Sequence, residues 1–209
     1  SIREYIRNFI MSKLETNTID TVSGTNTLTL GSSNLSTINM ASGVSPGTGM
    51  GKVLQVVSTT KTDTFSTTAG GDAPATITGL TATITPSSTS SKILVIPNAN
   101  IGSSSDNHIA LTLFRGTTAI GIGDTASNRP RASFTGSNHT VGGSYTWNMQ
   151  TASFNFLDTP SSTSSLSYSV KVGGNGSTTI YVNRSGRDRD ITTEDGRYAS
   201  TITLMEISA

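Results

Sequence analysis

The sequence ATITGLTATITP (residues 75–86) is followed by the hydroxyl-rich SSTSS (87–91) and then by KILVIP (92–97). The first stretch places its larger apolar side chains close to every second position among threonines, at Ile77, Leu80, Ala82 and Ile84. This alternation predicts a strand with one face in a core and the other in water. Pro86 lacks a ladder N–H and short hydroxyl side chains favour a turn. We therefore predict a hairpin at the centre of an antiparallel β-domain.

The same alternation recurs along the chain, with turn signals about every ten residues. Gly116-Thr117 and the glycine-rich 173–176 are two such turns. No helical pattern separates the segments, which predicts an all-β fold, an antiparallel, jelly-roll-like β-sandwich over residues 51–209. The further expected strands are 53–57, 62–67, 109–115, 119–124 (forming a hairpin with 109–115), one near 132–134, 145–149, 152–158, 166–172, 179–184 and 200–207.

Composition narrows the classes of function. Only 33% of the 209 residues are hydrophobic, but only 13% are charged, so the chain lacks the high charge typical of disorder, and its many threonines favour strands. A net charge of +1 gives no field for capturing a nucleic acid. The absence of cysteine excludes disulfides, zinc–thiolate sites and a cysteine nucleophile.

The first fourteen residues, SIREYIRNFIMSKL, predict a short amphipathic helix within residues 1–15, with a stripe formed by Ile2, Ile6, Phe9, Ile10 and Leu14. Arg3, Arg7 and Lys13 make the segment too charged for a membrane span or a signal peptide, so we expect no membrane insertion. Because a lone helix of this length is marginal in water, its stripe should pack either on its own domain or in an attachment or oligomerisation contact.

Residues 16–50 form a repetitive Ser/Thr-rich segment with isolated apolar residues and related units such as TNTID, TNTLTLG and LSTINM. A single copy has too few large side chains to close a core, whereas three copies wound about one axis share theirs. We predict a trimeric, β-rich stem that ends in a Gly/Pro hinge at 45–51, with a flexible linker as the alternative.

No catalytic constellation is evident, and we expect no enzyme, no cofactor and no metal. His108 and His139 are the only histidines. Asp106 and His108 are a conceivable metal pair, but two residues do not make a coordination shell, and a solvated turn is the alternative. The motifs of serine hydrolases, zinc proteases and P-loop enzymes are all missing from the sequence.

Residues 184–197, RSGRDRDITTEDGR, combine four arginines with four carboxylates at Asp188, Asp190, Glu194 and Asp195. Paired carboxylates hydrolyse glycosides or hold calcium in other proteins. The interleaved arginines favour a self-neutralised salt-bridge loop instead, within one subunit or between subunits. Trp147 and Tyr145 share one face of an expected strand, which suits either a sugar-stacking surface or the core.

Several phrases of the sequence together resemble the C-terminal module of tail-fibre and other virion structural proteins of marine bacteriophages, cyanophages included. They are GKVLQVVSTTKTDTFSTT (51–68), TGLTATITPSSTSSKILV (78–95), IGIGD (120–124) with RAS (131–133), NFLDTPSSTSSLSYSVKV (155–172), YVNRSG (181–186) and STITLMEI (200–207). The upstream LETNTID and TLTLGSSNLSTINMASG are similar to the repetitive lead-in of such fibres.

The resemblance implies a non-enzymatic, homotrimeric tail or head fibre. It would be assembled in the host cytoplasm, exposed on the virion, bound to other virion proteins through its N-terminal segment and adhesive toward a host-surface glycan or protein. Loops 128–143 and 186–196 are the expected contact regions. Alternatives are a capsid or collar decoration protein with a cementing role, a carbohydrate-binding module, and a depolymerase. The candidate receptor contacts are Tyr145, Trp147, Arg129, Arg131, His139, Arg187 and Arg189.

Overall fold

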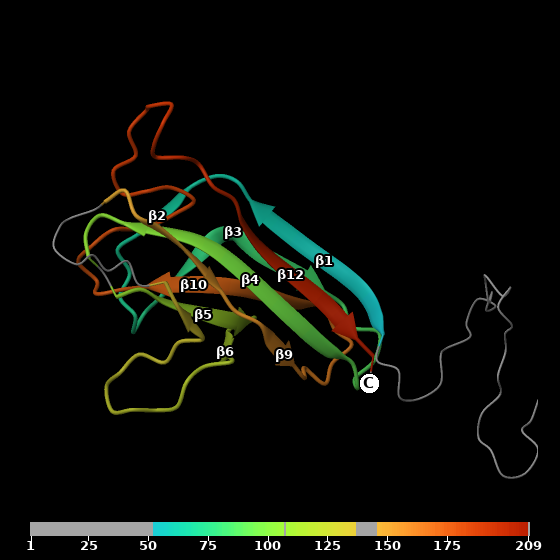
Figure 1. Ribbon diagram of the computed structural model, residues 1–209. Coiled ribbons are helices and arrows are strands. Elements are labelled where there is room, and N and C mark those ends of the chain that lie inside the picture. Colours follow the sequence, from blue (N-terminus) through green and yellow to red (C-terminus); the bar gives the residue numbers. More distant parts are fainter. Residues whose placement is uncertain (1–51, 107, 137–145, 209) are drawn as a thin grey trace, which may run out of the picture. The chain divides into compact units, whose positions relative to one another are not determined.

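The computed structural model describes residues 52–106, 108–136 and 146–208, which belong to one compact unit of the chain, Gly47–Ala209. These residues form strands and no helix, so the all-β prediction is confirmed (Figure 1). The predicted helix (1–15) and stem (16–50) lie outside the described residues. The strands are β1 (Val53–Lys61), β2 (Phe65–Thr67), β3 (Ala75–Ile84), β4 (Lys92–Ser103), β5 (Ala110–Arg115), β6 (Thr118–Ile120), β7 (Phe134–Thr135), β8 (Met149–Ser153), β9 (Phe156–Asp158), β10 (Leu166–Gly173), β11 (Ile180–Val182) and β12 (Ser200–Ile207).

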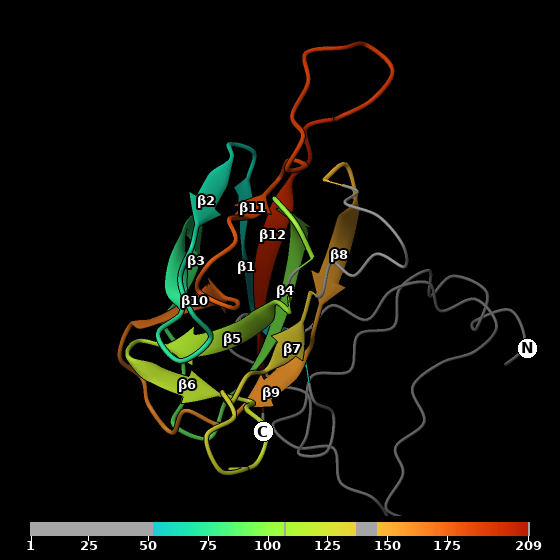
Figure 2. The ribbon, with the colours of Figure 1, turned by 90° about the vertical axis from the view of Figure 1, so that its left-hand side faces the viewer.

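The strands build two antiparallel sheets that face each other across the core (Figure 2). In the larger sheet, β1 pairs with β12 and β12 with β4, while β8 and β9 lie along the other edge of β4. The smaller sheet has the order β3, β10, β5, β6, with β7 also paired to β5. Its inner face and that of the larger sheet supply the buried apolar residues.

Four pairs of strands each form one interrupted row, in which the two strands lie end to end along the same edge of a neighbouring strand. β11 and β12 both line the same edge of β4, β8 and β9 line its other edge, and β6 and β7 both line β5. β2 and β1 pair with β11 and β12 in the same way. The chain then has eight rows, which in chain order are arranged 1-8-3-6 in one sheet and 2-7-4-5 in the other. This is the strand order of a jelly roll, as the sequence predicted.

The predicted central hairpin is wrong, because β3 and β4 lie in different sheets. Alternation specifies which face of a strand is buried, and the fully buried Ile77 of β3 and Val95 of β4 satisfy it from opposite sides of one core. It does not specify the hydrogen-bonding partner of a strand. The second expected hairpin is confirmed, since β5 and β6 pair through a turn in which Gly116 has φ 57°.

A buried carboxylate holds the turn between β3 and β4. Ser87 donates to Glu206 Oε1 from its backbone N at 2.7 Å and from its hydroxyl at 2.6 Å, and Gln55 Nε2 donates to Oε2 at 2.6 Å. Burial raises the pKa of Glu206, but the hydrogen bonds outweigh it and lower the pKa to about 2. The crossing between the sheets is thus tied to β12 and β1.

A second buried polar cluster joins the two sheets. The fully buried Tyr168 of β10 donates from its hydroxyl to Asp158 Oδ2 of β9 at 2.7 Å. Arg115 of β5 donates to both carboxylate oxygens of Asp158, at 2.8 and 2.7 Å. Burial, with the contact to Asp158, raises the pKa of Tyr168. The charge of Asp158 is therefore paired inside the sandwich.

Two of the interrupted rows send out long loops, which we call the 121–133 excursion, between β6 and β7, and the 183–199 excursion, between β11 and β12. At the base of each excursion, a serine hydroxyl hydrogen-bonds to the adjacent strand and to the residue where the loop departs. Ser133 Oγ accepts from Leu113 N and donates to Ile120 O, both at 2.9 Å. Ser200 Oγ accepts from Asn100 N at 3.0 Å and donates to Asn183 Oδ1 at 2.6 Å.

Asn183 fixes the base of the 183–199 excursion. It is fully buried and has φ 65°, the left-handed conformation that asparagine tolerates better than most residues. Its Nδ2 donates to Lys61 O at 2.8 Å and to Asp63 O at 2.9 Å, in the interruption between β1 and β2. Its backbone N donates to Asn100 O at 2.9 Å. Through its side chain and its backbone N–H together, Asn183 therefore ties three rows of the larger sheet.

We predict that Ser200→Ala lowers the free energy of unfolding by about 1–3 kcal/mol, because Asn100 N and Asn183 Oδ1 lose a buried partner. Ser167→Ala, on the exposed face of β10, should change it by less than about 0.5 kcal/mol. Urea unfolding of the two variants measures the difference. Equal effects would contradict the closing role of Ser200.

Candidate functional site

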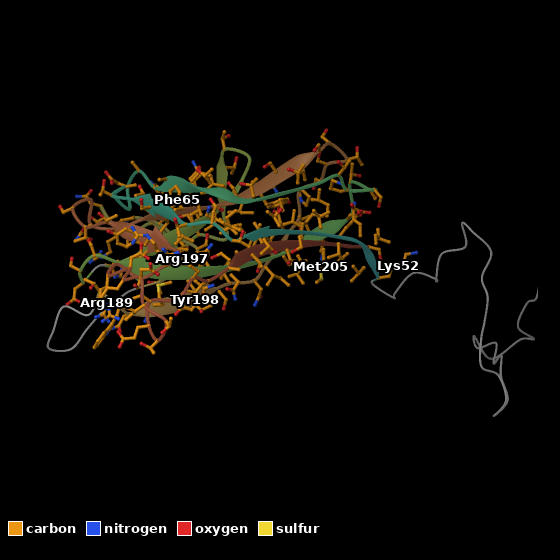
Figure 3. All side chains as sticks on the ribbon, turned by 90° about the horizontal axis from the view of Figure 1, so that it is seen from above. Lys52, Phe65, Arg189, Arg197, Tyr198 and Met205 are labelled. Atoms are coloured by element: carbon orange, nitrogen blue, oxygen red, sulfur yellow. The ribbon has the colours of Figure 1, made fainter. Side chains whose placement is uncertain are left out.

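The two ends of the sandwich differ. At the end we call proximal, Lys52 N donates to Ser208 Oγ and Ser208 N donates to Lys52 O, both at 3.0 Å. At the opposite end, which we call distal, β4 finishes at Ser103 and the connections 68–74, 104–109 and 174–179 meet through backbone hydrogen bonds. Figure 3 shows Arg189 toward one end and Lys52 at the other. Chain entry and exit thus share the proximal end.

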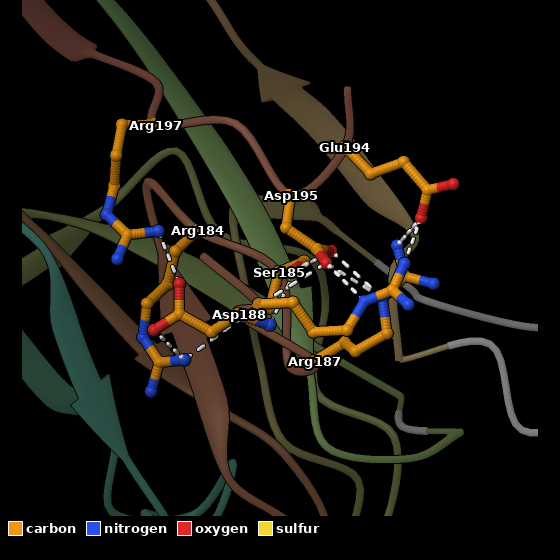
Figure 4. Close-up of polar contacts among 8 residues, drawn as sticks. Arg184, Ser185, Arg187, Asp188, Glu194, Asp195 and Arg197 are labelled. Carbon is orange, nitrogen blue, oxygen red and sulfur yellow. Dashed lines mark hydrogen bonds and ion pairs between the residues drawn. The ribbon is translucent and has the colours of Figure 1, made fainter. Parts of the chain in front are cut away.

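The 183–199 excursion is organised around Asp195, whose side chain is fully buried (Figure 4). Asp195 accepts from Ser185 Oγ at 2.8 Å, from Arg187 Nε at 2.8 Å and from Arg189 Nε at 3.2 Å. Burial raises the pKa of Asp195, but these hydrogen bonds outweigh it and hold the pKa well below its usual range. The carboxylate stays ionised and fixes both arginines.

The remaining charges of this loop, apart from Asp190, are also paired within the described part of the chain. Glu194 contacts both Arg187 and Arg189, while Asp188 contacts Arg197 and lies 3.1 Å from Arg184. The predicted self-neutralised salt-bridge loop is therefore present, inside one subunit. Its paired carboxylates are engaged by arginines, which disfavours calcium binding there. Within the described ranges, no group of three or more His, Asp or Glu side chains is arranged to hold a metal ion.

Trp147 lies in a turn before β8, so the strand predicted over 145–149 is wrong at residues 146–148. Its side chain is 47% exposed, which also excludes the core interpretation. The Arg187 guanidinium lies 4.7 Å from the Trp147 ring centroid, and Arg187 N donates to Thr146 O at 2.9 Å. The excursion thus holds this aromatic ring at the distal end.

Arg129 and Arg131 lie elsewhere, in the 121–133 excursion, where they border a pocket of about 550 Å³. His108, Asp124, Pro130 and Phe134 also line it. The candidate contact residues therefore form two groups, one around Trp147 and one around this pocket. Tyr145 and His139 lie outside the described residues. Because His108 shares the pocket with two arginines, the Asp106–His108 pair, conceivable as metal ligands from the sequence, has an unfavourable electrostatic setting for a cation.

The pocket was missed by sequence reasoning, although a signal was present. In residues 184–197 arginines alternate with acids, whereas RPR (129–131) has its nearest acidic residue at Asp124. Unbalanced arginines in an otherwise charge-poor chain are candidates for an external partner.

No helix among the described residues is long and apolar enough to cross a membrane.

No family model and no curated protein matches this chain. Structures of infectious bursal disease virus align at 13% identity over 83% of this chain and 47% of theirs, with a TM-score of 0.35 for the Gt strain and 0.34 for the Gx strain. The tripod from the baseplate of bacteriophage Tuc2009 aligns at 12% identity over 98% of this chain and 88% of its own, with a TM-score of 0.21. The chain spans about half the length of the two bursal disease virus chains. Similarity this low assigns no function.

We predict that Asp195→Asn loosens the 183–199 excursion, because the amide cannot replace a carboxylate between Arg187 and Arg189. Trypsin should cleave after these arginines several times faster than in the wild type. Asp190→Asn is the matched control, since no ion pair of Asp190 occurs in the described part of the chain. Limited proteolysis followed by mass spectrometry gives the rates. Equal rates in both variants would refute the central role of Asp195.

Proposed function

We propose that this chain is a structural protein of a virus particle, and specifically a homotrimeric phage fibre, of the tail or the head, that adheres to the host surface through its distal end. The sequence resemblance from residue 51 onward supports the fibre family. The jelly-roll order is compatible with it, since this fold occurs in viral capsids and lectins, but a fold alone does not fix a function.

The observation that carries the proposal is an apolar row on the outer face of the larger sheet. The strand register aligns Val56 with Met205, Met205 with Leu94 and Leu94 with Leu157, across four neighbouring rows. All four point away from the core. Val56 is 56% exposed and Leu157 is 47% exposed. Val53, Leu54 and Ile207 extend this apolar half-face toward the proximal end.

Most of the remaining outer sheet surface is polar. Toward the distal end the same outer face carries Ser58 bonded to Thr203 at 2.9 Å, and Thr151 bonded to Asn100 at 2.7 Å. The outer face of the smaller sheet presents mainly serine, threonine and lysine, at Thr81, Thr83, Ser167, Ser169 and Lys171. Its half-buried Phe114 lies beneath Lys171, whose Nζ is 4.0 Å from the ring centroid. The apolar half-face is thus a local feature, of the kind that marks protein contacts.

A second copy of the chain is the partner that we assign to the apolar half-face. Residues 1–51 join the sandwich at Lys52, directly beside it, and their sequence predicts threefold assembly. Three copies brought together there would bury these faces against one another while their distal ends stay exposed. Three weak contacts to a host surface would then reinforce each other through effective concentration.

The distal end offers the means of adhesion. Trp147, Ile191 and Tyr198 are 47%, 41% and 42% exposed, and the last two belong to the 183–199 excursion. Exposed aromatic rings beside fixed arginines suit sugar or protein surfaces.

A decoration protein would use the same apolar half-face against the capsid. Locating the chain on an intact particle separates the two candidates, because a fibre projects from the particle and a decoration protein lies on the shell.

We predict that the full chain has the mass of three copies in solution and that Val56→Lys with Leu157→Lys weakens the trimer. The concentration for half-dissociation should rise at least about tenfold, because two charges enter an apolar contact. Ser58→Lys with Ser153→Lys is the matched control, with the same added charge on the polar half. Light scattering over a dilution series measures the mass in solution and the concentration for half-dissociation of each variant. A monomer at all concentrations, or equal weakening by the two variants, contradicts the assembly.

We predict that the purified chain competes with the parent phage for adsorption to its host, and that Trp147→Ala reduces this competition at least about tenfold. Lys92→Ala, at the proximal end, should compete like the wild type. The measurement is the count of unadsorbed phage as a function of added protein. Failure of the wild-type chain to compete would remove adhesion from the proposal.

A further inference from the structure

Arg129 and Arg131 differ from every other arginine that the structure describes. The other five, at 115, 184, 187, 189 and 197, each contact a carboxylate of the same chain. Within the described ranges, neither Arg129 nor Arg131 has an ion pair, and both side chains are exposed. The chain therefore neutralises its arginines elsewhere and leaves two positive charges together at one pocket.

The pocket has the size and the surfaces of a ligand site. Its volume of about 550 Å³ lies within the range of about 300–1,000 Å³ typical of such sites. Ala110, Pro130 and Phe134 give it an apolar lining, against the polar groups of the two arginines. Phe134 stacks on Phe154, with ring centroids 5.6 Å apart, which fixes the orientation of its ring.

The loop that carries the arginines is held in place by its own backbone. Arg131 Nε donates to Gly123 O at 2.6 Å, and Gly123 N donates to Ala132 O at 3.1 Å. Arg129 donates to Ala126 O from its backbone N at 3.1 Å and from its side chain at 3.4 Å. A guanidinium has five N–H groups, so each arginine keeps donors available. Ordering before binding lowers the entropic cost of capturing a ligand.

The position of the pocket places it toward the distal end. His108 belongs to the 104–109 connection, and Ala110 opens β5 opposite Thr135 of β7. Pro130 lies against the 68–74 connection, since a Cβ on Gly71 would come within 3.1 Å of Pro130 Cγ. Figure 2 shows the loop between β6 and β7 standing out from the edge of the smaller sheet. A ligand here would be reached from outside the sandwich.

We propose that this pocket binds an acidic sugar residue, one that carries a carboxylate or a sulfate on a pyranose ring. The planar donors of Arg129 and Arg131 match two oxygens of such a group and form charge-assisted hydrogen bonds. The apolar face of the ring packs on the Phe134 side of the pocket. Asp124 is the one carboxylate among the described lining residues, and it accepts from sugar hydroxyls. The inference deepens the proposed function and rests on it only for the source of the sugar.

The test is calorimetric titration of the full chain with three probes, a galacturonic acid trimer, a sulfated galactose and the neutral maltotriose. We expect the wild type to bind one or both anionic probes and to ignore the neutral one. Arg129→Gln with Arg131→Gln should weaken anionic binding by about tenfold or more for each arginine, the loss expected for a charge-assisted hydrogen bond. Carboxylate and sulfate probes separate the two sources of the anionic group.

The matched control is Lys52→Gln with Lys92→Gln, which removes the same charge at the proximal end and should bind like the wild type. Arg129→Lys with Arg131→Lys keeps the charge but loses the planar fork, and should retain binding weakened several-fold. Equal binding of the neutral probe, no binding of either anionic probe, or unchanged binding by the glutamine variant would each overturn the proposal. Anionic binding without competition for phage adsorption would leave the pocket standing and reject adhesion.

Discussion

The structure depends on how the backbone of an interrupted row is satisfied. A ladder strand such as β4 or β5 has N–H groups that need acceptors along its whole length, and a loop that leaves the row removes them. Ser133 and Ser200 each place a hydroxyl at the break, accept from the adjacent strand and donate back to the departing chain. Two hydroxyl groups therefore let a jelly roll carry long loops in the middle of its strands.

The excursions divide the protein into a scaffold and a variable surface. The core uses isoleucine, leucine and valine with a few paired polar groups, such as Asp158 with Arg115 and Tyr168. Most of the other charges of the described residues lie on the two excursions, where their pairing differs. The 183–199 excursion uses its charges to hold its own shape, whereas Arg129 and Arg131 of the 121–133 excursion have no ion pair among the described residues and border a pocket. The two excursions thus differ in how far their own carboxylates neutralise their arginines, and this difference is the basis of the proposed ligand site.

The outer faces of the two sheets also differ in polarity from one part to another. One half of the outer face of the larger sheet is apolar beside Lys52, and the other outer sheet surfaces present mainly hydroxyl groups. Apolar residues on an outer face do not contribute to the core of a single sandwich, because the inner faces of the two sheets supply that core. Their alignment across four rows is visible only when the register of every strand is known. It is the physical basis for proposing a second copy as the partner of this face.

By itself, the sequence determined the β-structure, nearly all strands, the loop 184–197 and its charge pairing, because alternation and charge order are local properties of the chain. It could not determine that β3 and β4 belong to different sheets, that Trp147 sits in an exposed turn, or that Arg129 and Arg131 border a pocket. Those facts depend on which strands pair, since the same inward-facing residues satisfy a core from either sheet. Only the tertiary structure decides that pairing, and with it the position of every loop that carries function.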